Sequence, residues 1–333
     1  MRKKLPFLII GLLLFSAGLI WFLPLFGRPL PKKSAETEPA AALSQQVSTP
    51  PARGDEGLNA DPLQATATLV SPAKPACRGP QSLTLLVLGI DENAQADAIR
   101  LVRLDLHQGR VAVVAIPRDF YVPIVDMSQH GITQGRINAT YGYGEWYNGR
   151  GGGIISVADN IAHNFGVTPD HYLVLSFANI AQYIDQVGGV EIELHQPVAD
   201  GRHYFASGHH HLAGETAVVF MRMRYYDSDF ARIRRQSLIL RAFYNQVMDE
   251  LNIFEQTQLA FQGLLDKNIH SDLAFKDMPP LICLVQTVDT GDVSFVEIPS
   301  ELYRSHTTSG GANVQIPSQE VAPFIQRVME GSW

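Results

Sequence analysis

The sequence predicts an α/β domain with a mixed central sheet and helices on both faces, preceded by one transmembrane helix. Three observations indicate this fold class. An uncharged, apolar run extends from Leu5 to Gly27. From Leu83 onwards, short apolar runs alternate with segments of helical periodicity, as expected for helices packed on a sheet. In addition, 46% of the 333 residues are hydrophobic and 18% are charged, which is enough apolar content for one large domain.

The run from Leu5 to Gly27 is mostly Leu, Ile and Phe. It is long enough for a helix that crosses a bilayer core, which needs about 20 residues. No small-x-small site ends the run, which favours an uncleaved anchor over a cleaved signal peptide. Basic residues flank the run on both sides, so the positive-inside comparison is nearly balanced. The short leading tail favours residues 1–27 as a cytoplasmic stub and single-pass anchor in the cell membrane.

Residues 28–80 are rich in Pro, Ala, Ser, Thr and Gln and lack apolar periodicity. This composition is typical of a disordered tether, which leaves residues 81–333 as an extracytoplasmic domain. The net charge of −7, without a basic domain, argues against a protein that holds nucleic acid by its phosphates.

The chain has two cysteines, Cys77 and Cys283. Outside the membrane such a pair permits one disulfide, which would tie the leading segment of the domain to a late helix. The alternative is two unrelated thiols, with Cys283 buried in the apolar run of residues 281–285. A disulfide requires a Cα separation of about 4.4–6.8 Å, so both alternatives stay open at this point.

Apolar runs and helical periodicity give the expected elements of the domain. Pro279 and Pro280 are expected to break or bend the helix that contains them. Strands are expected over residues 83–90, 99–106, 111–116, 172–175, 190–194 and 293–298. Helices are expected over residues 153–166, 178–187, 255–266, 273–288 and 319–330, with one more after residues 227–229.

Arginines are concentrated in residues 222–236, a segment with five arginines, two aspartates and one glutamine. Arg222 and Arg224 are two positions apart, so in an extended segment their side chains leave on the same side. Few acidic residues nearby are available to neutralise them. The density of guanidinium groups indicates an anion site.

The second half of this segment is expected to begin a helix, because residues 227–229 form a good N-cap cluster. Arg232, Arg235 and Gln236 then share one face of the first two turns. Guanidinium groups beside the N-terminus of a helix suit a phosphate or pyrophosphate. The alternative is a helix with solvated charges and local Arg–Asp pairs.

Acidic and basic side chains also follow two of the expected strands. Asp91 and Asp97 stand at the two ends of a short polar loop. They could share a divalent cation, since hard cations prefer oxygen ligands, or they could be ordinary loop acids. Pro117 ends the third strand and leaves Arg118 and Asp119 where open α/β sheets place ligands, although this pair could also simply cap the strand.

Two further segments carry polar or aromatic side chains. In residues 135–147, Arg136 and Asn138 supply donors, and the aromatic residues either stack on a sugar, line a groove or fill a loop. The run His209–His211 could bind a soft metal. Consecutive histidines project in different directions, however, so a solvated loop is expected there.

In order along the chain, these segments form a series of motifs. Leu-Gly-Ile-Asp is followed by Ala-Asp, then Ile-Pro-Arg-Asp, Arg-Ile-Asn-Ala-Thr-Tyr, and Asp185–Gly189 before Val-Glu-Ile. Leu-Ala-Gly-Glu-Thr-Ala then precedes Arg-x-Arg and Asp-Phe-x-Arg-x-x-Arg-Gln. Over residues 83–250 this series resembles the LytR-CpsA-Psr family of cell-wall glycopolymer transferases, which have a three-layer domain.

The resemblance implies a membrane-anchored phosphotransferase. Its substrate would be a glycan linked to a polyprenyl-pyrophosphate carrier, and the glycan-1-phosphate would move onto a hydroxyl of peptidoglycan. Two alternatives remain: a non-catalytic protein that binds polyprenyl-pyrophosphate lipids, and a pyrophosphatase that acts on the lipid-linked glycan with water in place of the sugar hydroxyl. No nucleic acid partner is implied.

The matching positions imply roles for individual residues. Asp91 and Asp97 would hold Mg²⁺, with Mn²⁺ as the alternative ion. Either Asp97 or Asp119 would be the base for the acceptor hydroxyl, and Arg118, Arg224 and Arg232 would complete the catalytic set. The residues implied to bind the pyrophosphate are Arg118, Arg136, Arg222, Arg224, Arg232, Arg235 and Gln236.

The sequence departs from the family pattern at two positions in the acidic loop. Asn93 stands where the family often has arginine, and Ala98 stands where it often has threonine. The first departure removes one phosphate donor from the loop.

Overall fold

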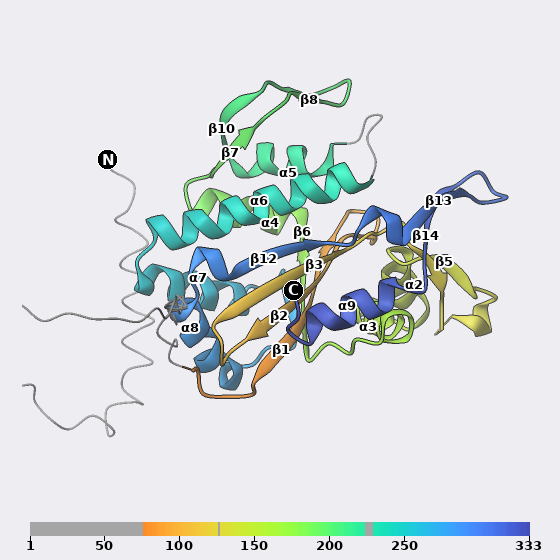
Figure 1. The fold of residues 1–333 in the computed structure, drawn as a ribbon, viewed down its shortest axis with the longest axis horizontal. Helices are drawn as coiled ribbons and strands as arrows, with labels where there is room; N and C mark the ends of the chain where they lie inside the picture. The colour runs from red at the N-terminus through yellow and green to blue at the C-terminus, as the bar shows by residue number, and fades with distance from the viewer. Residues whose placement is uncertain (1–75, 126, 224–228) are drawn as a thin grey trace, which may run out of the picture. The chain divides into compact units, whose positions relative to one another are not determined.

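The computed structural model describes residues 76–125, 127–223 and 229–333 (Figure 1). The expected anchor, all but the last residues of the expected tether, and Arg224 lie outside these ranges. No helix within the described ranges is both long enough and apolar enough to cross a bilayer.

Six strands form a central sheet in the order β11-β6-β1-β2-β3-β12. β2 is antiparallel to both β1 and β3, whereas β6 is parallel to β1 and β12 is parallel to β3. The sheet is therefore mixed, as predicted. Its strands are β1 (Ser82–Ile90), β2 (Ala96–Asp105), β3 (Arg110–Ile116), β6 (His171–Ser176), β11 (His270–Ser271) and β12 (Val293–Glu297).

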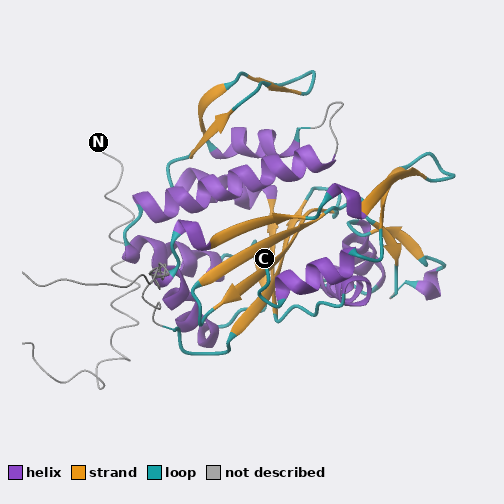
Figure 2. Ribbon diagram, in the orientation of Figure 1, coloured by secondary structure: helices purple, strands orange, loops and turns teal. Residues whose placement is uncertain are grey.

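One face of the sheet is covered by α3 (Gly152–Phe165) and α9 (Val321–Met329), as Figure 2 shows. The covered side chains alternate along the strands, as the two-residue period of a strand requires. Leu86 of β1 packs in one cluster with Ile161 of α3 and Ile325 of α9, and all three are fully buried. This cluster is the largest part of the core.

The opposite face is covered by α6 (Asp229–Glu250) and α8 (Met278–Thr287). Leu85 of β1 points to this face, opposite to Leu86. It packs with Leu284 of α8 and Tyr244 of α6. Helices therefore lie on both faces of the sheet, as predicted.

A second core lies among α4 (Phe177–Gln186), α5 (Gly214–Arg222) and α6. Gly214 lets α5 approach α4 closely, because a Cβ at this position would collide with the carbonyl oxygen of Ala181. Asp185 caps the start of α5, since its Oδ1 accepts a hydrogen bond of 2.7 Å from the Gly214 N–H. Gly214 and Asp185, each part of a motif noted above, thus have structural roles here.

The remaining described elements extend the edges of the domain. Eight further strands form four two-stranded sheets, in which β4 pairs with β5, β7 with β10, β8 with β9 and β13 with β14. These strands are β4 (Tyr121–Pro123), β5 (Gln134–Arg136), β7 (Val190–Leu194), β8 (Val198–Ala199), β9 (Tyr204–Phe205), β10 (Gly208–Leu212), β13 (Tyr303–Thr307) and β14 (Asn313–Pro317). The other helices are α2 (Ala139–Tyr147), α7 (Ile253–Leu265) and the 3₁₀ turns Ser128–His130, Phe275–Asp277, Thr290–Asp292 and Ser300–Leu302.

Two expectations about local structure are wrong. The histidine run is part of β10, not a loop, because it pairs with β7, where Val190 and Ile192 are buried. Its alternate residues His209 and His211 both lie within reach of Glu191 on the exposed side. Arg222 is the last residue of α5, so it is helical and not extended, while Arg224 lies outside the described residues.

Proline and glycine also have different effects from those expected. Pro279 and Pro280 occupy the first turn of α8, where their missing N–H groups cost no helical hydrogen bond, so they begin the helix instead of breaking it. Residues 139–147 form a helix despite Gly142 and Gly144. Gly144 is needed for packing there, because a Cβ would collide with the carbonyl oxygen of Gly152.

The two cysteines form a disulfide, Cys77–Cys283, with a Cα separation of 5.7 Å. Cys77 is 2% exposed and packs with Leu106 and Leu284 in the cluster on the α8 face of the sheet. The bond joins the start of the described domain to α8 and closes a loop with a sequence separation of 206 residues.

Replacing both cysteines by serine is expected to destabilise the domain by about 2–4 kcal/mol, because the unfolded chain loses a long covalent constraint. The measurement is urea unfolding of the double variant and of the oxidised wild type. Wild type treated with a reductant serves as the control and should approach the variant. An unchanged unfolding midpoint would show that the bond does not contribute to stability.

Candidate functional site

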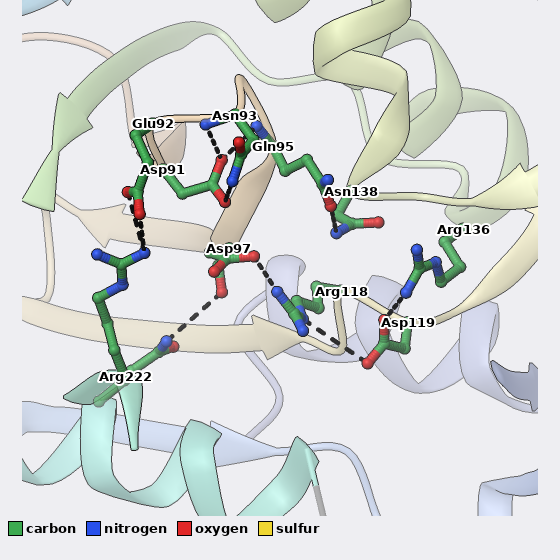
Figure 3. A network of polar contacts seen from close by, with 11 residues as sticks. Asp91, Glu92, Asn93, Gln95, Asp97, Arg118, Asp119, Arg136, Asn138 and Arg222 are labelled. Carbon is green, nitrogen blue, oxygen red and sulfur yellow. Dashed lines mark hydrogen bonds and ion pairs between the residues drawn. The ribbon is translucent and has the colours of Figure 1, made fainter. Parts of the chain in front are cut away.

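The candidate site lies at one edge of the central sheet, where β1 ends, β2 begins and β3 ends (Figure 3). The antiparallel register sets Ile90 opposite Ala96, and Ile99 opposite Ile116. The loop after β1, the start of β2 and the segment after β3 therefore meet. This register brings together the four residues singled out after the strands, namely Asp91, Asp97, Arg118 and Asp119.

A chain of ion pairs runs along this edge. Arg118 Nη1 donates to Asp97 Oδ1. Arg118 Nε lies 3.7 Å from Asp119 Oδ2, and Arg136 Nη1 donates to Asp119 Oδ1 at 3.2 Å. The side chains of Arg118 and Asp97 are only 7% and 12% exposed. Arg118 therefore does more than cap its own strand, because it also bridges to β2.

Asp91 organises the loop between β1 and β2. Its Oδ1 accepts hydrogen bonds from the backbone N–H groups of Asn93 at 3.0 Å and Gln95 at 2.8 Å. Its Oδ2 accepts a bond of 3.3 Å from the Asn93 side chain. The loop is shorter than expected, since β2 already begins at Ala96 and Asp97 is its second residue.

Asn138 ties the aromatic segment to this edge. Its backbone N–H donates to the Arg118 carbonyl, and its own carbonyl accepts from the Ala96 N–H, both at 3.2 Å. Its side chain is fully buried and donates to Gln95 Oε1 at 3.0 Å. The Asn138 Oδ1 atom is buried and has no hydrogen-bond partner among the described residues.

Arg222 reaches the site from the end of α5. Its Nη2 donates to both carboxylate oxygens of Glu92, at 2.9 and 3.0 Å (Figure 3). Its guanidinium group lies 5.0 Å from the ring centre of Phe177. The hydrogen bond from Arg222 holds the pKa of the Glu92 carboxyl below its usual range. Arg222 and Glu92 line a cavity of about 410 Å³ together with Asp91, Phe177 and Val218.

The face of α6 predicted to carry the site is buried. Arg232, Arg235 and Gln236 are 3%, 6% and 1% exposed. Gln236 Nε2 lies 3.4 Å from the carbonyl oxygen of Asp97, which links α6 to the start of β2. Arg235 Nη2 instead donates to the carbonyl oxygen of Met223 at 2.6 Å, so it holds the end of α5.

Arg100 is a residue at this site that the sequence interpretation missed. It lies in β2, three positions after Asp97, and is 3% exposed. Its Nη2 donates to Gln236 Oε1 at 2.8 Å and its Nη1 to the Ile99 carbonyl at 3.1 Å. Two arginines, Arg100 and Arg103, interrupt the otherwise mainly apolar residues 99–106, and charged residues inside an expected buried strand were the signal that could have revealed it.

The carboxylates at this edge suit a hard cation whose remaining ligands come from water and substrate. No group of three or more His, Cys, Asp or Glu residues in the described ranges could hold a metal ion. Mg²⁺, however, is often bound through one or two carboxylates, with waters and substrate phosphates as the other ligands. Asp91 and Asp97, which flank the loop, offer this smaller set of oxygen donors.

Among curated proteins, the chain is similar to the polyisoprenyl-teichoic acid–peptidoglycan teichoic acid transferase TagU of Bacillus cereus. The two are 29% identical over 203 residues, which cover 59% of this chain and 63% of TagU. The matched region is therefore less than two thirds of the length of that relative.

Solved structures share the fold. TagV of B. subtilis aligns with a TM-score of 0.63 and 20% identity over 76% of this chain and 98% of TagV. The structure of TagT bound to LIIa-WTA aligns with a TM-score of 0.59 and 20% identity, covering 78% of this chain and 98% of that protein. Residues 60–329 match the LytR_cpsA_psr family, and because this is most of the sequence, the chain belongs to that family.

Proposed function

We propose that the protein is a membrane-anchored phosphotransferase that moves a glycan-1-phosphate from a polyprenyl-pyrophosphate carrier onto a peptidoglycan hydroxyl. The observation that carries the proposal is the edge of the sheet where Asp91 and Asp97 lie with Arg118 and Arg222, beside an open cavity of about 410 Å³. Carboxylates for a hard cation and guanidinium groups for phosphate are what phosphoryl transfer requires.

The relatives support the class of substrate. TagU is named for transfer of a teichoic acid from a polyisoprenyl carrier to peptidoglycan, and TagT binds LIIa-WTA in its structure. We infer that this chain takes a polyprenyl-pyrophosphate-linked glycan as donor and peptidoglycan as acceptor. The apolar lining supplied by Phe177 and Val218 beside Arg222 suits a ligand with a charged head and a lipid tail.

Arginine is suited to the pyrophosphate because its planar guanidinium group donates two parallel hydrogen bonds to phosphate oxygens. Arg118 and Arg222 would each exchange a carboxylate of the protein for a phosphate of the substrate. The residues proposed to bind the pyrophosphate are Arg118, Arg136, Arg222, Arg224, Arg232, Arg235 and Gln236.

In the proposed reaction, the acceptor hydroxyl oxygen forms a bond to the phosphorus that carries the glycan. The bond from this phosphorus to the bridging oxygen breaks, and polyprenyl phosphate leaves with that oxygen. Asp97 or Asp119 takes the hydroxyl proton, while Arg118, Arg224 and Arg232 stabilise the negative charge. Mg²⁺ or Mn²⁺ held by Asp91 and Asp97 would neutralise charge on the phosphate oxygens.

We further propose the arrangement in the cell envelope that the sequence indicates. Residues 1–27 would be the stub and anchor, residues 28–80 the tether, and residues 81–333 the extracytoplasmic catalytic domain. The Cys77–Cys283 bond supports this location, because structural disulfides persist in oxidising compartments.

The purified protein, given Mg²⁺, a short polyprenyl-pyrophosphoryl glycan and peptidoglycan fragments, is expected to release polyprenyl phosphate and attach the glycan to the acceptor. Mass spectrometry of lipid and glycan products measures both. Binding without turnover would contradict the proposal and support a lipid-binding protein. Release of free phosphorylated glycan, with none on the acceptor, would support a pyrophosphatase instead.

Replacing Arg232 by lysine is expected to lower the rate of transfer by about 10²-fold, since lysine keeps the charge but loses the planar fork. The matched control on the same helix is Arg234→Lys. Arg234 is exposed and pairs with Glu297, unlike the buried Arg232, so this variant should keep the wild-type rate. Equal transfer rates for the two variants would show that Arg232 does not belong to the site.

Replacing Asp91 by asparagine is expected to raise the Mn²⁺ concentration needed for half-saturation by about tenfold, because one charged oxygen donor is lost. Electron paramagnetic resonance of bound Mn²⁺, with a prenyl pyrophosphate present, measures this without turnover. Glu191→Gln is the control, since it also removes one carboxylate charge but lies on β7, where Glu191 contacts His209 and His211. If only the control shifts, the metal assignment is wrong.

A further inference from the structure

A buried arginine in a central strand is unusual and calls for a physical explanation. Arg100 lies within β2, which has neighbours on both sides in the six-stranded sheet, and it is 3% exposed. Its guanidinium group stays charged inside proteins, and burying a charge costs several kcal/mol unless polar partners compensate. An apolar residue would satisfy the fold at this position without that cost.

The direction of the side chain places this charge near the candidate site. Ile99 and Leu101, its neighbours in β2, face the cluster covered by α3 and α9. Side chains alternate along a strand, so Arg100 faces α6. There its Nη2 donates to Gln236 Oε1 at 2.8 Å.

Gln236 connects Arg100 to Asp97. The Gln236 side chain, on a residue that is 1% exposed, accepts from Arg100 through Oε1 and directs Nε2 toward the Asp97 carbonyl at 3.4 Å. An arginine can only donate, so it fixes which end of the amide faces it. The donor end of Gln236 is thereby directed to the edge where Asp97 and Arg118 pair.

We propose that Arg100 is a positioning residue for the pyrophosphate site: it fixes the amide of Gln236, whose other end contacts the Asp97 carbonyl, and it places a permanent positive charge next to that amide. This inference rests on the proposed function, because it assigns Arg100 to the same anion. The loop Asp91–Gln95 contains no arginine. Arg100 supplies from the strand a guanidinium group that the loop lacks, in a region of low dielectric where its field is strong.

β2 contains a matched control for this proposal. Arg103 is also buried, at 8% exposed, but it donates to the Met329 carbonyl of α9 and lies 3.6 Å from Asp105. Arg103 is three residues after Arg100 in the same strand, so its side chain points to the opposite face of the sheet. It carries the same charge in the same strand without touching Gln236.

Binding of geranyl pyrophosphate with Mg²⁺, measured by calorimetry, tests the proposal. Arg100→Met is expected to weaken binding by about tenfold, as for loss of a hydrogen bond to a charged group. Arg103→Met should keep wild-type affinity at temperatures where both variants are folded, as checked by circular dichroism. Arg100→Lys should recover part of the affinity, because lysine restores the positive charge but not the planar guanidinium group.

Comparing the binding losses of the Arg100 and Gln236 variants, alone and combined, shows whether Arg100 acts on binding through Gln236 or only stabilises the fold. If Arg100 acts through Gln236, the double variant Arg100→Met/Gln236→Met should bind no more weakly than about the weaker single variant. Additive losses would overturn the positioning role. Should Arg100→Met fail to fold, Gln236→Glu provides the second test: it keeps a partner for Arg100 but loses the donor, and should weaken binding without lowering the unfolding temperature.

The outcomes distinguish failure of this inference from failure of the proposed function. If the wild type does not bind geranyl pyrophosphate, the pyrophosphate site itself is wrong. If the wild type binds and both Arg100→Met and Gln236→Glu keep its affinity, the site stands and the role of Arg100 is wrong.

Discussion

The ion pair between Asp97 and Arg118 is the interaction on which the candidate site depends. It joins the start of β2 to the segment after β3, and both side chains are largely buried. Buried charges are stable only when paired, so removing one partner would leave the other uncompensated. Asp119 and Arg136 extend the pairing toward α2, while Gln236 connects the Asp97 backbone to α6. Charge at this edge is thus held by contacts from several elements.

These pairs also define what an incoming anion has to replace. Asp97 and Glu92 neutralise Arg118 and Arg222 within the protein. The pair with Asp97 limits the cost of burying the charge of Arg118, whereas the pair between Glu92 and Arg222 is partly exposed. Under the proposed function, a pyrophosphate would exchange with these carboxylates, so its affinity would be the difference between two sets of charged hydrogen bonds. Specificity for a doubly phosphorylated head would then follow from the need to satisfy several guanidinium groups at once.

Most of the sheet could be predicted from the sequence, because apolar runs such as residues 83–90 and 111–116 have few other stable placements. The grouping of Asp91, Asp97 and Arg118 at one site was implied by the resemblance to the family, and the register of β1, β2 and β3 brings their segments together. The contact between Arg100 and Gln236 could not be predicted, since it depends on which face of β2 meets α6. The histidine strand was missed for a similar reason: its pairing with β7, not its own composition, makes it a strand.

The most direct test of the account is a crystal structure of the protein with Mn²⁺ and a thiophosphate analogue of a prenyl pyrophosphate. Anomalous scattering then locates the metal and the phosphate sulfur separately. The account predicts a Mn²⁺ peak within ligand distance of Asp91 and Asp97, and a sulfur peak beside Arg118 and Arg222. A metal bound elsewhere, or a pyrophosphate away from this edge of the sheet, would contradict it.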